Sequence, residues 1–238
     1  MIDETIAEIR DMQTHSSSVV AVKATRALSE LLERDHATVE EFERDLERNA
    51  SALKRANPSH ASLFNAMQTV LVNVVDRKDS VEESKSLLAD VTERVVEDVR
   101  QGKSRAARQA APSFEDGKTF LTHDFSSTVL EAIERAVDDG ADLTAYVTEA
   151  RPRYLGRKCA RRLAGIDSVE PHLLVDGAAG SFLAECDRVV IGMDCIVDDT
   201  LYNRVGTYPI VATAAHLDVP VTVVGSAAKI VDSGFVFE

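Results

Sequence analysis

The feature that most constrains the fold is a change in hydrophobic periodicity near residue 110. Before it, apolar residues recur at every third or fourth position, as in the series Leu63, Met67, Leu71 and Val74. This spacing places one apolar stripe along a helix and leaves the charged residues on its other faces. We therefore predict an α-helical domain of about five helices over residues 1–110.

Two capping patterns place helix starts in this domain. Thr38 is followed three residues later by Glu41, and Ser80 by Glu83, which is the spacing of a capping box. The first pattern predicts a helix over residues 38–54. We expect most of this domain to serve packing and dimerisation.

From Gly117 onward, short β-rich runs alternate with helical patterns. The runs occupy residues 119–123, 142–150, 172–179, 188–197 and 219–225, and the helical patterns lie near 127–138, 154–164 and 208–217. Apolar strands that alternate with helices indicate a parallel sheet covered on both faces. The chain is thus predicted to be α+β overall, with a parallel-sheet α/β domain over residues 111–238.

Polar residues of this second half gather where the runs end. His123 and Asp124 close the first run, Glu149 and Arg151 the second, and Asp194 lies late in the fourth. Ligands of open parallel sheets bind outside the carboxyl ends of the strands. The functional site is therefore expected at these strand ends.

Three arginines, Arg151, Arg153 and Arg157, follow the second run at the predicted start of a helix. Helix N-termini attract anions, and the planar guanidinium group matches two phosphate oxygens at once. We favour phosphate binding by Arg151. The alternative for all three is a surface arginine paired with one of the abundant acids.

The segment around Asp194 has the richest chemistry. Asp194 ends an apolar run, where an ionised carboxylate is costly without a partner or a task, so we interpret it as functional. Asp198 and Asp199 begin the next loop and are expected to be solvated. Because no histidine–carboxylate spacing accompanies these acids, no metal is expected. For Ser126 and Ser127 the preferred interpretation is the start of a helix.

Composition excludes several classes of function. The formal net charge of −13 disfavours direct nucleic-acid binding, which needs a basic stripe. The three cysteines lack C-x-x-C spacing, and neither G-x-G-x-x-G nor G-x-x-x-x-G-K-[ST] occurs, so no disulfide, zinc site or cofactor is expected. A polar, acidic start and the lack of an apolar run of ~18–20 residues predict a cytoplasmic protein without membrane contact.

Five segments, taken in order, resemble the initiation-factor-2B-related family. They are FLTHDFSSTVLEAI, TEARPRYLGRKCARRL, LLVDGAAGSFL, VVIGMDCIVDDTLYNRVGTYPIVATAA and VPVTVVGSAAK. The family contains the alpha, beta and delta subunits of translation initiation factor 2B and isomerases of methylthioribose 1-phosphate and ribose 1,5-bisphosphate. The resemblance covers residues 117–238 and is weaker over 1–110. It implies a Rossmann-like fold that dimerises.

The resemblance also implies roles for individual residues. Asp194 matches the aspartate that acts as acid and base in the isomerases, and Arg151 matches the arginine of their T-E-x-R-P motif. Asn203 and Arg204 match an Asn-Lys pair that contacts substrate, and Lys229 aligns with a lysine near the last strand.

The first strand end departs from the isomerases. They carry T-H-C where this chain has Thr122-His123-Asp124, and their Arg-Pro-Thr phosphate motif appears here as Asn57-Pro58-Ser59. An asparagine carries no charge to hold a phosphate dianion. His123 and Asp124, with Ser126 and Ser127, are expected to line the pocket.

These observations lead to two functional hypotheses. The first is an initiation-factor-2B-like protein that binds a phosphosugar or a nucleoside monophosphate in a regulatory role. It would form a homodimer or higher oligomer, with an initiation factor 2 subunit as a candidate partner. The alternative is an aldose–ketose isomerase, for example of ribose 1,5-bisphosphate, with Asp124 and Asp194 as its acid/base pair and Arg151 holding phosphate.

Overall fold

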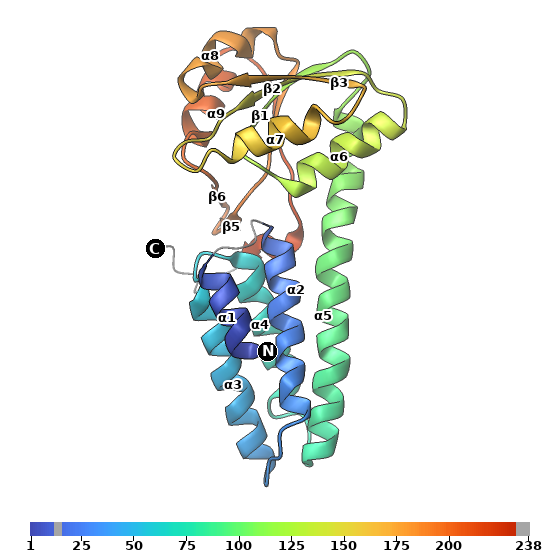
Figure 1. The fold of residues 1–238 in the computed structure, drawn as a ribbon, viewed down its shortest axis with the longest axis vertical. Coiled ribbons are helices and arrows are strands. Elements are labelled where there is room, and N and C mark those ends of the chain that lie inside the picture. The colour runs from blue at the N-terminus through green and yellow to red at the C-terminus, as the bar shows by residue number, and fades with distance from the viewer. Residues whose placement is uncertain (12–15, 232–238) are drawn as a thin grey trace. The chain divides into compact units, whose positions relative to one another are not determined.

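The computed structural model describes residues 1–11 and 16–231, which form two compact units. The helical unit contains Met1–Gly102, Cys195–Asp199 and the segment from Ala227, and the sheet unit contains Lys103–Asp194 and Thr200–Ser226. The coarse expectation of a helical part and a parallel-sheet part is confirmed (Figure 1). The domain boundary expected after residue 110 stays a prediction. Residue 110 is the last residue of helix α5 (Val81–Ala110).

The helical unit is built from amphipathic helices, as the periodicity predicts. They are α1 (Ile2–Arg10), α2 (Ser17–Ala27), the 3-10 turn η1 (Leu28–Leu32), α3 (Val39–Ala56), α4 (Ala61–Val74) and most of α5. Thr38 caps α3 by accepting a hydrogen bond from the Glu41 N–H at 3.3 Å, and Ser80 accepts one from the Glu83 N–H at 3.2 Å. Both predicted capping residues therefore start helices.

A mostly aliphatic core holds these helices together. Phe42, Leu46, Leu63, Met67 and Leu88 are fully buried in it. Burial of one such side chain contributes about 1.5–3 kcal/mol. Within the same unit, β5 (Cys195–Val197) pairs in parallel with β8 (Ile230–Val231).

The sheet unit contains a five-stranded sheet whose paired strands are all parallel, in the order β3-β2-β1-β4-β7. Its strands are β1 (Thr119–His123), β2 (Leu143–Thr148), β3 (Val169–Leu174), β4 (Arg188–Ile191) and β7 (Val221–Val223). The connecting helices are α6 (Ser127–Asp138), α7 (Leu155–Leu163), α8 (Ala179–Phe182) and α9 (Thr207–His216). A short strand, β6 (Thr200–Tyr202), precedes α9.

Apolar side chains on both faces of the sheet bury it between helices (Figure 1). Phe120 and Val190 belong to the cluster formed with α6 and α7, whereas Leu121 and Ile191 belong to the cluster formed with α8 and α9. Successive strand residues point to opposite faces, so strands covered on both sides must be apolar throughout. This explains why the sequence shows continuous apolar runs rather than alternation.

Two strands differ most from their expected bounds. The run predicted over 188–197 is divided between β4, which ends at Ile191, and β5, which begins at Cys195 and pairs with β8 in a different sheet. The third strand extends over Val169–Leu174 rather than over 172–179, and it contains Pro171. A proline is tolerated there because β3 is an edge strand.

Candidate functional site

The chain order of the sheet identifies one crevice as the natural binding site. From β1 the chain proceeds to β2 and β3 on one side, and β4 and β7 lie on the other side. At such a switch point the loops that leave two neighbouring strands run in opposite directions and open a crevice at their carboxyl ends. Asp124 directly follows β1, and Asp194 follows β4 by three residues. Both predicted catalytic aspartates therefore lie at the switch point.

One arginine contacts both of these aspartates. Arg204 Nε lies 2.9 Å from Asp124 Oδ2, and Arg204 Nη2 lies 3.4 Å from Asp194 Oδ1. The side chain of Asp124 is only 8% exposed, compared with 30% for Asp194 and 34% for Arg204. We call Asp124, Arg204 and Asp194 the Arg204 bridge.

Burial makes Asp124 the unusual member of the bridge. Loss of hydration raises the pKa of its carboxyl group, and the nearby positive charge of Arg204 only partly opposes this effect. The neighbouring Asp194 carboxylate adds to the increase in the pKa. Two close carboxyl groups with different surroundings suit acid–base chemistry, since one can carry the proton that the other lacks.

The loop that carries Arg204 is anchored at both ends. The Asp194 N–H donates a hydrogen bond to the Tyr202 carbonyl oxygen at 3.1 Å, and Asn203 Nδ2 donates to Thr207 Oγ1 at 3.1 Å. Gly206 then adopts φ +104 at the start of α9, a conformation that strongly favours glycine. Asn203 thus stabilises this turn, while its predicted contact with a ligand stays a prediction.

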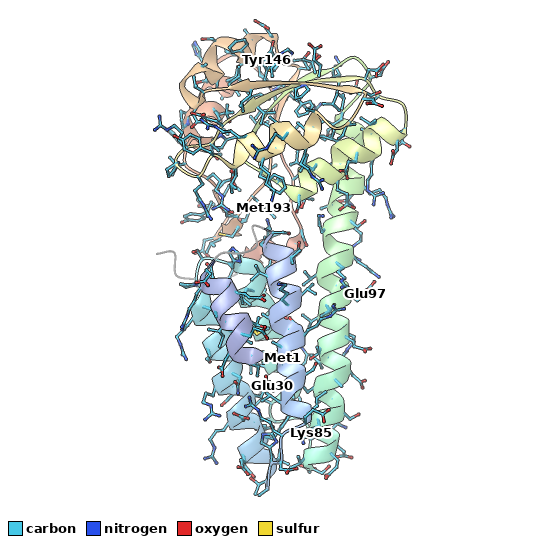
Figure 2. The ribbon with its side chains drawn as sticks, viewed as in Figure 1. Met1, Glu30, Lys85, Glu97, Tyr146 and Met193 are labelled. Carbon is cyan, nitrogen blue, oxygen red and sulfur yellow. The ribbon has the colours of Figure 1, made fainter. Side chains whose placement is uncertain are left out.

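A close contact with Gly225 constrains Met193, the residue before Asp194. Met193, labelled in Figure 2, is buried, and a Cβ at Gly225 would come within 2.4 Å of its Cε atom. A side chain at position 225 would require Met193 to move. The segment that follows β7 therefore helps to fix the backbone that carries Asp194.

His123 faces the protein interior. Its side chain has both ring nitrogens engaged, with Nδ1 lying 2.6 Å from Thr148 Oγ1 and Nε2 lying 2.8 Å from the Val205 carbonyl oxygen. The residue is only 2% exposed. Its predicted role in ligand binding stays a prediction, and its visible contacts are structural.

The two serines mark the start of α6, as expected. Ser126 is the N-cap and accepts a hydrogen bond from the Val129 N–H at 3.3 Å, and Ser127 is the first residue of the helix. Ser126 also lies against Gly192 after β4. Both serines are therefore near the strand ends, where their predicted contact with an anion stays a prediction.

The end of β2 already holds a carboxylate. The N–H groups of Ala150 and Arg151 donate to the two carboxylate oxygens of Asp176 at 2.8 and 2.7 Å. Asp176 thus occupies backbone donors that could otherwise face a phosphate. The side chain of Arg151 is exposed and lies over the Tyr154 ring, 5.6 Å from its centroid.

Further positions considered for ligand binding are placed differently. Arg157 is paired with the buried Glu149, with Nη2 2.6 Å from Oε2, so its charge is already compensated. Asn57 and Lys229 both lie in the helical unit. Ser59 Oγ donates a hydrogen bond to Asn57 Oδ1 at 3.3 Å. The role of Lys229 stays a prediction.

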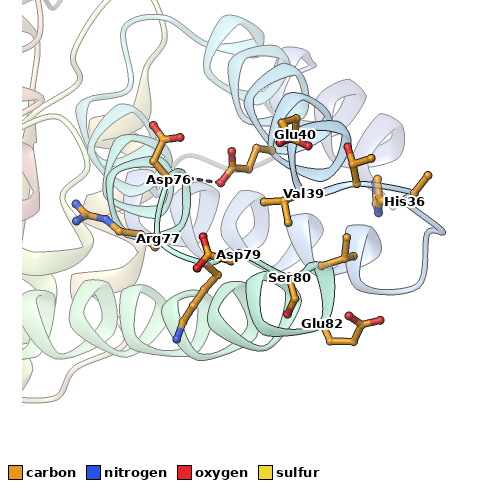
Figure 3. Close-up of a pocket in the computed structure, with 13 residues that line it drawn as sticks. His36, Val39, Glu40, Asp76, Arg77, Asp79, Ser80 and Glu82 are labelled. Carbon is orange, nitrogen blue, oxygen red and sulfur yellow. Dashed lines mark hydrogen bonds between the residues drawn. The ribbon is translucent and has the colours of Figure 1, made fainter.

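The helical unit has a pocket of its own, of about 770 Å³ (Figure 3). Five carboxylate side chains and two basic ones line it, between the segments that precede α3 and α5. Among the lining residues, Glu43 accepts a hydrogen bond from the Asp76 N–H at 2.7 Å. The excess of negative charge disfavours a phosphorylated ligand here.

Residues 1–11 and 16–231 contain no group of three or more histidine, cysteine or acidic side chains placed to hold a metal ion. In the same residues, no helix is both long and apolar enough to cross a bilayer.

Comparison with known proteins adds independent findings. The model of the initiation factor 2 subunit family matches residues 13–234. The ribose 1,5-bisphosphate isomerase of Haloterrigena turkmenica is 33% identical over 228 residues, which cover 95% of this chain and 69% of that protein. Its namesake in Methanocaldococcus jannaschii is 33% identical over 226 residues, covering 92% of this chain and 70% of that protein.

A solved structure resembles the whole fold. The translation initiation factor eIF-2B of Pyrococcus horikoshii OT3 superposes with a TM-score of 0.84 at 25% sequence identity. The match covers 96% of this chain and 79% of that one.

Proposed function

The chain belongs to the initiation factor 2 subunit family, and from this premise we propose that it is a sugar-phosphate isomerase that converts an aldose to a ketose. Ribose 1,5-bisphosphate is the candidate substrate, because relatives that are 33% identical carry the name of its isomerase. These names favour the isomerase hypothesis over a regulatory role. The observation that carries the proposal is the Arg204 bridge at the switch point of the sheet.

The proposed reaction keeps every atom of the sugar. A hydrogen moves with its bonding electron pair from C2 to C1. The C2 hydroxyl group loses a proton and becomes the ketone, and the ring oxygen gains a proton as its bond to C1 breaks. One group must therefore donate a proton and a second must accept one. Asp124, whose pKa is raised by burial, suits the donor, and the more exposed Asp194 suits the acceptor. Exchange with solvent restores both carboxyl groups.

Arginines suit the anionic parts of this substrate. The guanidinium group of Arg204 is partly exposed beside the two carboxyl groups, and Arg151 is exposed at the end of the neighbouring strand β2. A planar guanidinium group binds phosphate through two parallel hydrogen bonds. In the proposal, Arg151 holds one phosphate, and Arg204 contacts the reacting end of the sugar.

The direct test is a turnover assay with purified protein and ribose 1,5-bisphosphate, in which phosphorus NMR follows the appearance of ribulose 1,5-bisphosphate. Asp194→Asn is expected to abolish turnover while the protein stays folded. The matched control is Asp187→Asn. Asp187 directly precedes β4, the strand that Asp194 follows, and it accepts hydrogen bonds from the Thr119 N–H and Lys118 Nζ at the opposite end of the sheet. Absence of turnover in folded wild-type protein contradicts the proposal, as does equal loss in both variants.

A regulatory, ligand-binding role is the second candidate function. It is favoured by Asp124, which occupies the position where the isomerases of the resembled family carry cysteine. A relative from Pyrococcus horikoshii named a putative translation initiation factor eIF-2B subunit 2-like is 30% identical over 215 residues. This role predicts binding of a phosphosugar or nucleoside monophosphate without turnover, and co-purification with an initiation factor 2 subunit. Homodimer formation and a cytoplasmic location stay predictions under both functions.

A further inference from the structure

A buried polar pair that the proposed chemistry does not use connects three parts of the sheet unit. His123 and Thr148 are register partners at the ends of β1 and β2, so their side chains emerge next to each other on one face of the sheet. Both residues are buried, Thr148 completely. From β1 the imidazole ring reaches the Val205 carbonyl oxygen, in the loop that precedes α9.

The hydrogen bonds define which ring nitrogen carries the proton. A carbonyl oxygen only accepts, so Nε2 must donate to Val205 across their 2.8 Å separation. In the neutral ring Nδ1 is then an acceptor, and the Thr148 hydroxyl group donates to it across 2.6 Å. The other acceptor near this hydroxyl, the Thr122 carbonyl oxygen, is 3.5 Å away. The Val205 carbonyl oxygen therefore requires the Nε2–H form of the ring, and the Thr148 hydroxyl group stabilises this form by donating to Nδ1.

The ring also fits the loop sterically. A Cβ at Gly206 would lie 2.8 Å from His123 Cε1 and 2.9 Å from Nε2, so the loop backbone rests directly on the imidazole edge. Val205, which accepts the hydrogen bond, is the residue after Arg204. Displacement of the ring must therefore move the backbone from which Arg204 reaches Asp124.

We propose that His123 and Thr148 are positioning residues that hold Arg204 between the two carboxyl groups of the Arg204 bridge. Neither needs to touch the substrate. The catalytic part of this inference rests on the proposed function, whereas the structural part, the position of the loop, does not.

The test compares Thr148→Val with Thr148→Ser. Valine keeps the shape of threonine and removes the hydroxyl group, while serine keeps the hydroxyl group and loses a methyl group. Thr148→Val is expected to lower kcat about tenfold or more with a smaller change in KM, and Thr148→Ser to restore most of it. If Thr148 had a purely structural role, kcat of each variant would fall in line with its loss of stability, which thermal unfolding measures.

A spectroscopic measurement separates this inference from the proposed function. Nitrogen-15 NMR of the wild-type protein is expected to show His123 as the Nε2–H tautomer, and Thr148→Val to shift the Val205 amide and Arg204 Nε signals. Should the wild-type protein show no turnover, these signals still decide the structural part. The inference is overturned if His123 is the Nδ1–H tautomer, or if Thr148→Val leaves the signals of Val205 and Arg204 unchanged.

A second variant covers the case in which Thr148→Val does not fold. His123→Gln keeps a donor that can reach the Val205 carbonyl oxygen but removes the ring and its contact with Thr148. It is expected to shift the same Arg204 Nε signal and to lower kcat to a similar extent. A folded His123→Gln protein with wild-type Arg204 signals also overturns the inference.

Discussion

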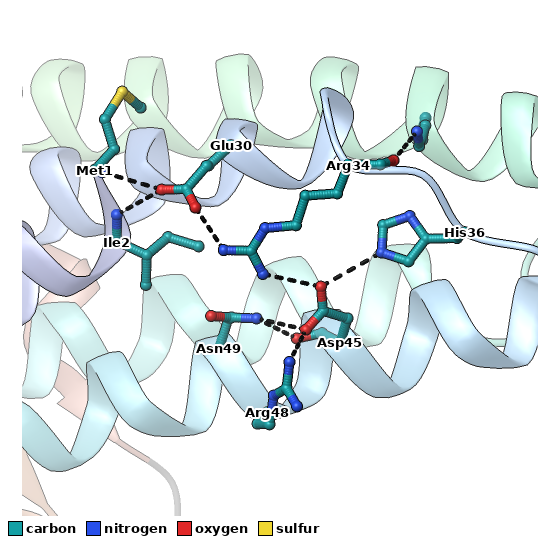
Figure 4. A network of polar contacts seen from close by, with 9 residues as sticks. Met1, Ile2, Glu30, Arg34, His36, Asp45, Arg48 and Asn49 are labelled. Carbon is teal, nitrogen blue, oxygen red and sulfur yellow. Dashed lines mark hydrogen bonds and ion pairs between the residues drawn. The ribbon is translucent and has the colours of Figure 1, made fainter.

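The two units of the molecule contain the same arrangement of charges with opposite effects on proton affinity. In the helical unit, Arg34 pairs with both Glu30 and Asp45 (Figure 4). We call these three residues the Arg34 bridge. In the sheet unit, the Arg204 bridge likewise places one guanidinium group between two carboxyl groups.

Extra hydrogen-bond donors distinguish the Arg34 bridge. The Ile2 N–H donates to Glu30 at 2.8 Å, and together with Arg34 it lowers the pKa of this carboxyl group to about 2. For Asp45, burial raises the pKa, but hydrogen bonds from Arg34, His36 and Arg48 outweigh that effect and the net shift is downward. Both carboxyl groups are held as anions, which indicates a structural role.

Burial distinguishes the Arg204 bridge. Desolvation of Asp124 exceeds the attraction of Arg204, so the pKa of this carboxyl group is raised. The comparison teaches that an arginine between two acids does not by itself identify a functional site. What separates the two bridges is whether the buried carboxyl group has enough donors to stabilise its anion.

Loss of the central arginine should have the largest effect. Arg204→Met is expected to lower turnover by about 10²–10³, as removal of a single preorganised donor typically does. Arg34→Met should leave turnover unchanged and lower the free energy of unfolding by about 1–2 kcal/mol. Kinetic assays and urea unfolding of both variants check this. Arg204→Lys, which keeps the positive charge, should retain part of the activity that Arg204→Met loses. If Arg204→Met and Arg34→Met show equal kinetics, the two bridges do not differ in function.

Neutralising one acid in each bridge should sharpen the contrast. Asp124→Asn is expected to lower turnover by about 10²-fold without loss of stability, because the native state already disfavours the Asp124 anion. Asp45→Asn should retain turnover and lower the free energy of unfolding by about 1–2 kcal/mol. Thermal unfolding and kinetic assays of the two variants measure both effects. A destabilised Asp124→Asn protein would mean that Asp124 is held as an anion.

The smallest expected effect is on how stability depends on pH, which should have opposite signs for Glu30 and Asp124. The pKa of Glu30 falls from 4.5 to about 2 on folding, so its contribution to stability is complete above pH 4.5 and is lost as the pH falls toward 2. The pKa of Asp124 is raised above 3.8, so its contribution is present below that pH and is lost as the pH rises through the folded value.

Urea unfolding of wild type, Glu30→Gln and Asp124→Asn across this pH range measures both contributions. The stability difference between wild type and Glu30→Gln should increase with pH, whereas the difference between wild type and Asp124→Asn should decrease. Slopes of the same sign would show that burial does not distinguish the two bridges.

Hydrophobic periodicity predicts most of the helices and strands, because the spacing of apolar residues in each element follows from which of its faces are buried. The helix expected near 127–138 coincides with α6, Ser127–Asp138. The third strand was less visible, since Pro171 and Glu170 on an edge strand obscure its apolar pattern. The rule that ligands bind at strand ends also identified Asp124 and Asp194, which lie at the switch point because β1 and β4 are neighbours.

The rest of the site depends on contacts between residues distant in sequence. Asp176 reaches back to the backbone after β2, and Thr148 orients the ring of His123 across two strands. Gly156, in the arginine-rich segment after β2, has a similar distant partner. A Cβ at this position would come within 1.8 Å of the Thr148 carbonyl oxygen. Neither spacing nor residue type in one sequence reveals such partners.

The most direct test of the account is a carbon-13 NMR titration of the side-chain carboxyl groups in the wild-type protein. Asp124→Asn and Glu30→Gln assign the two resonances. Asp124 should titrate above its ordinary value of 3.8, and Glu30 near 2. If Asp124 instead titrates at or below 3.8, Arg204 rather than burial controls it, and the Arg204 bridge is a structural ion pair like the Arg34 bridge.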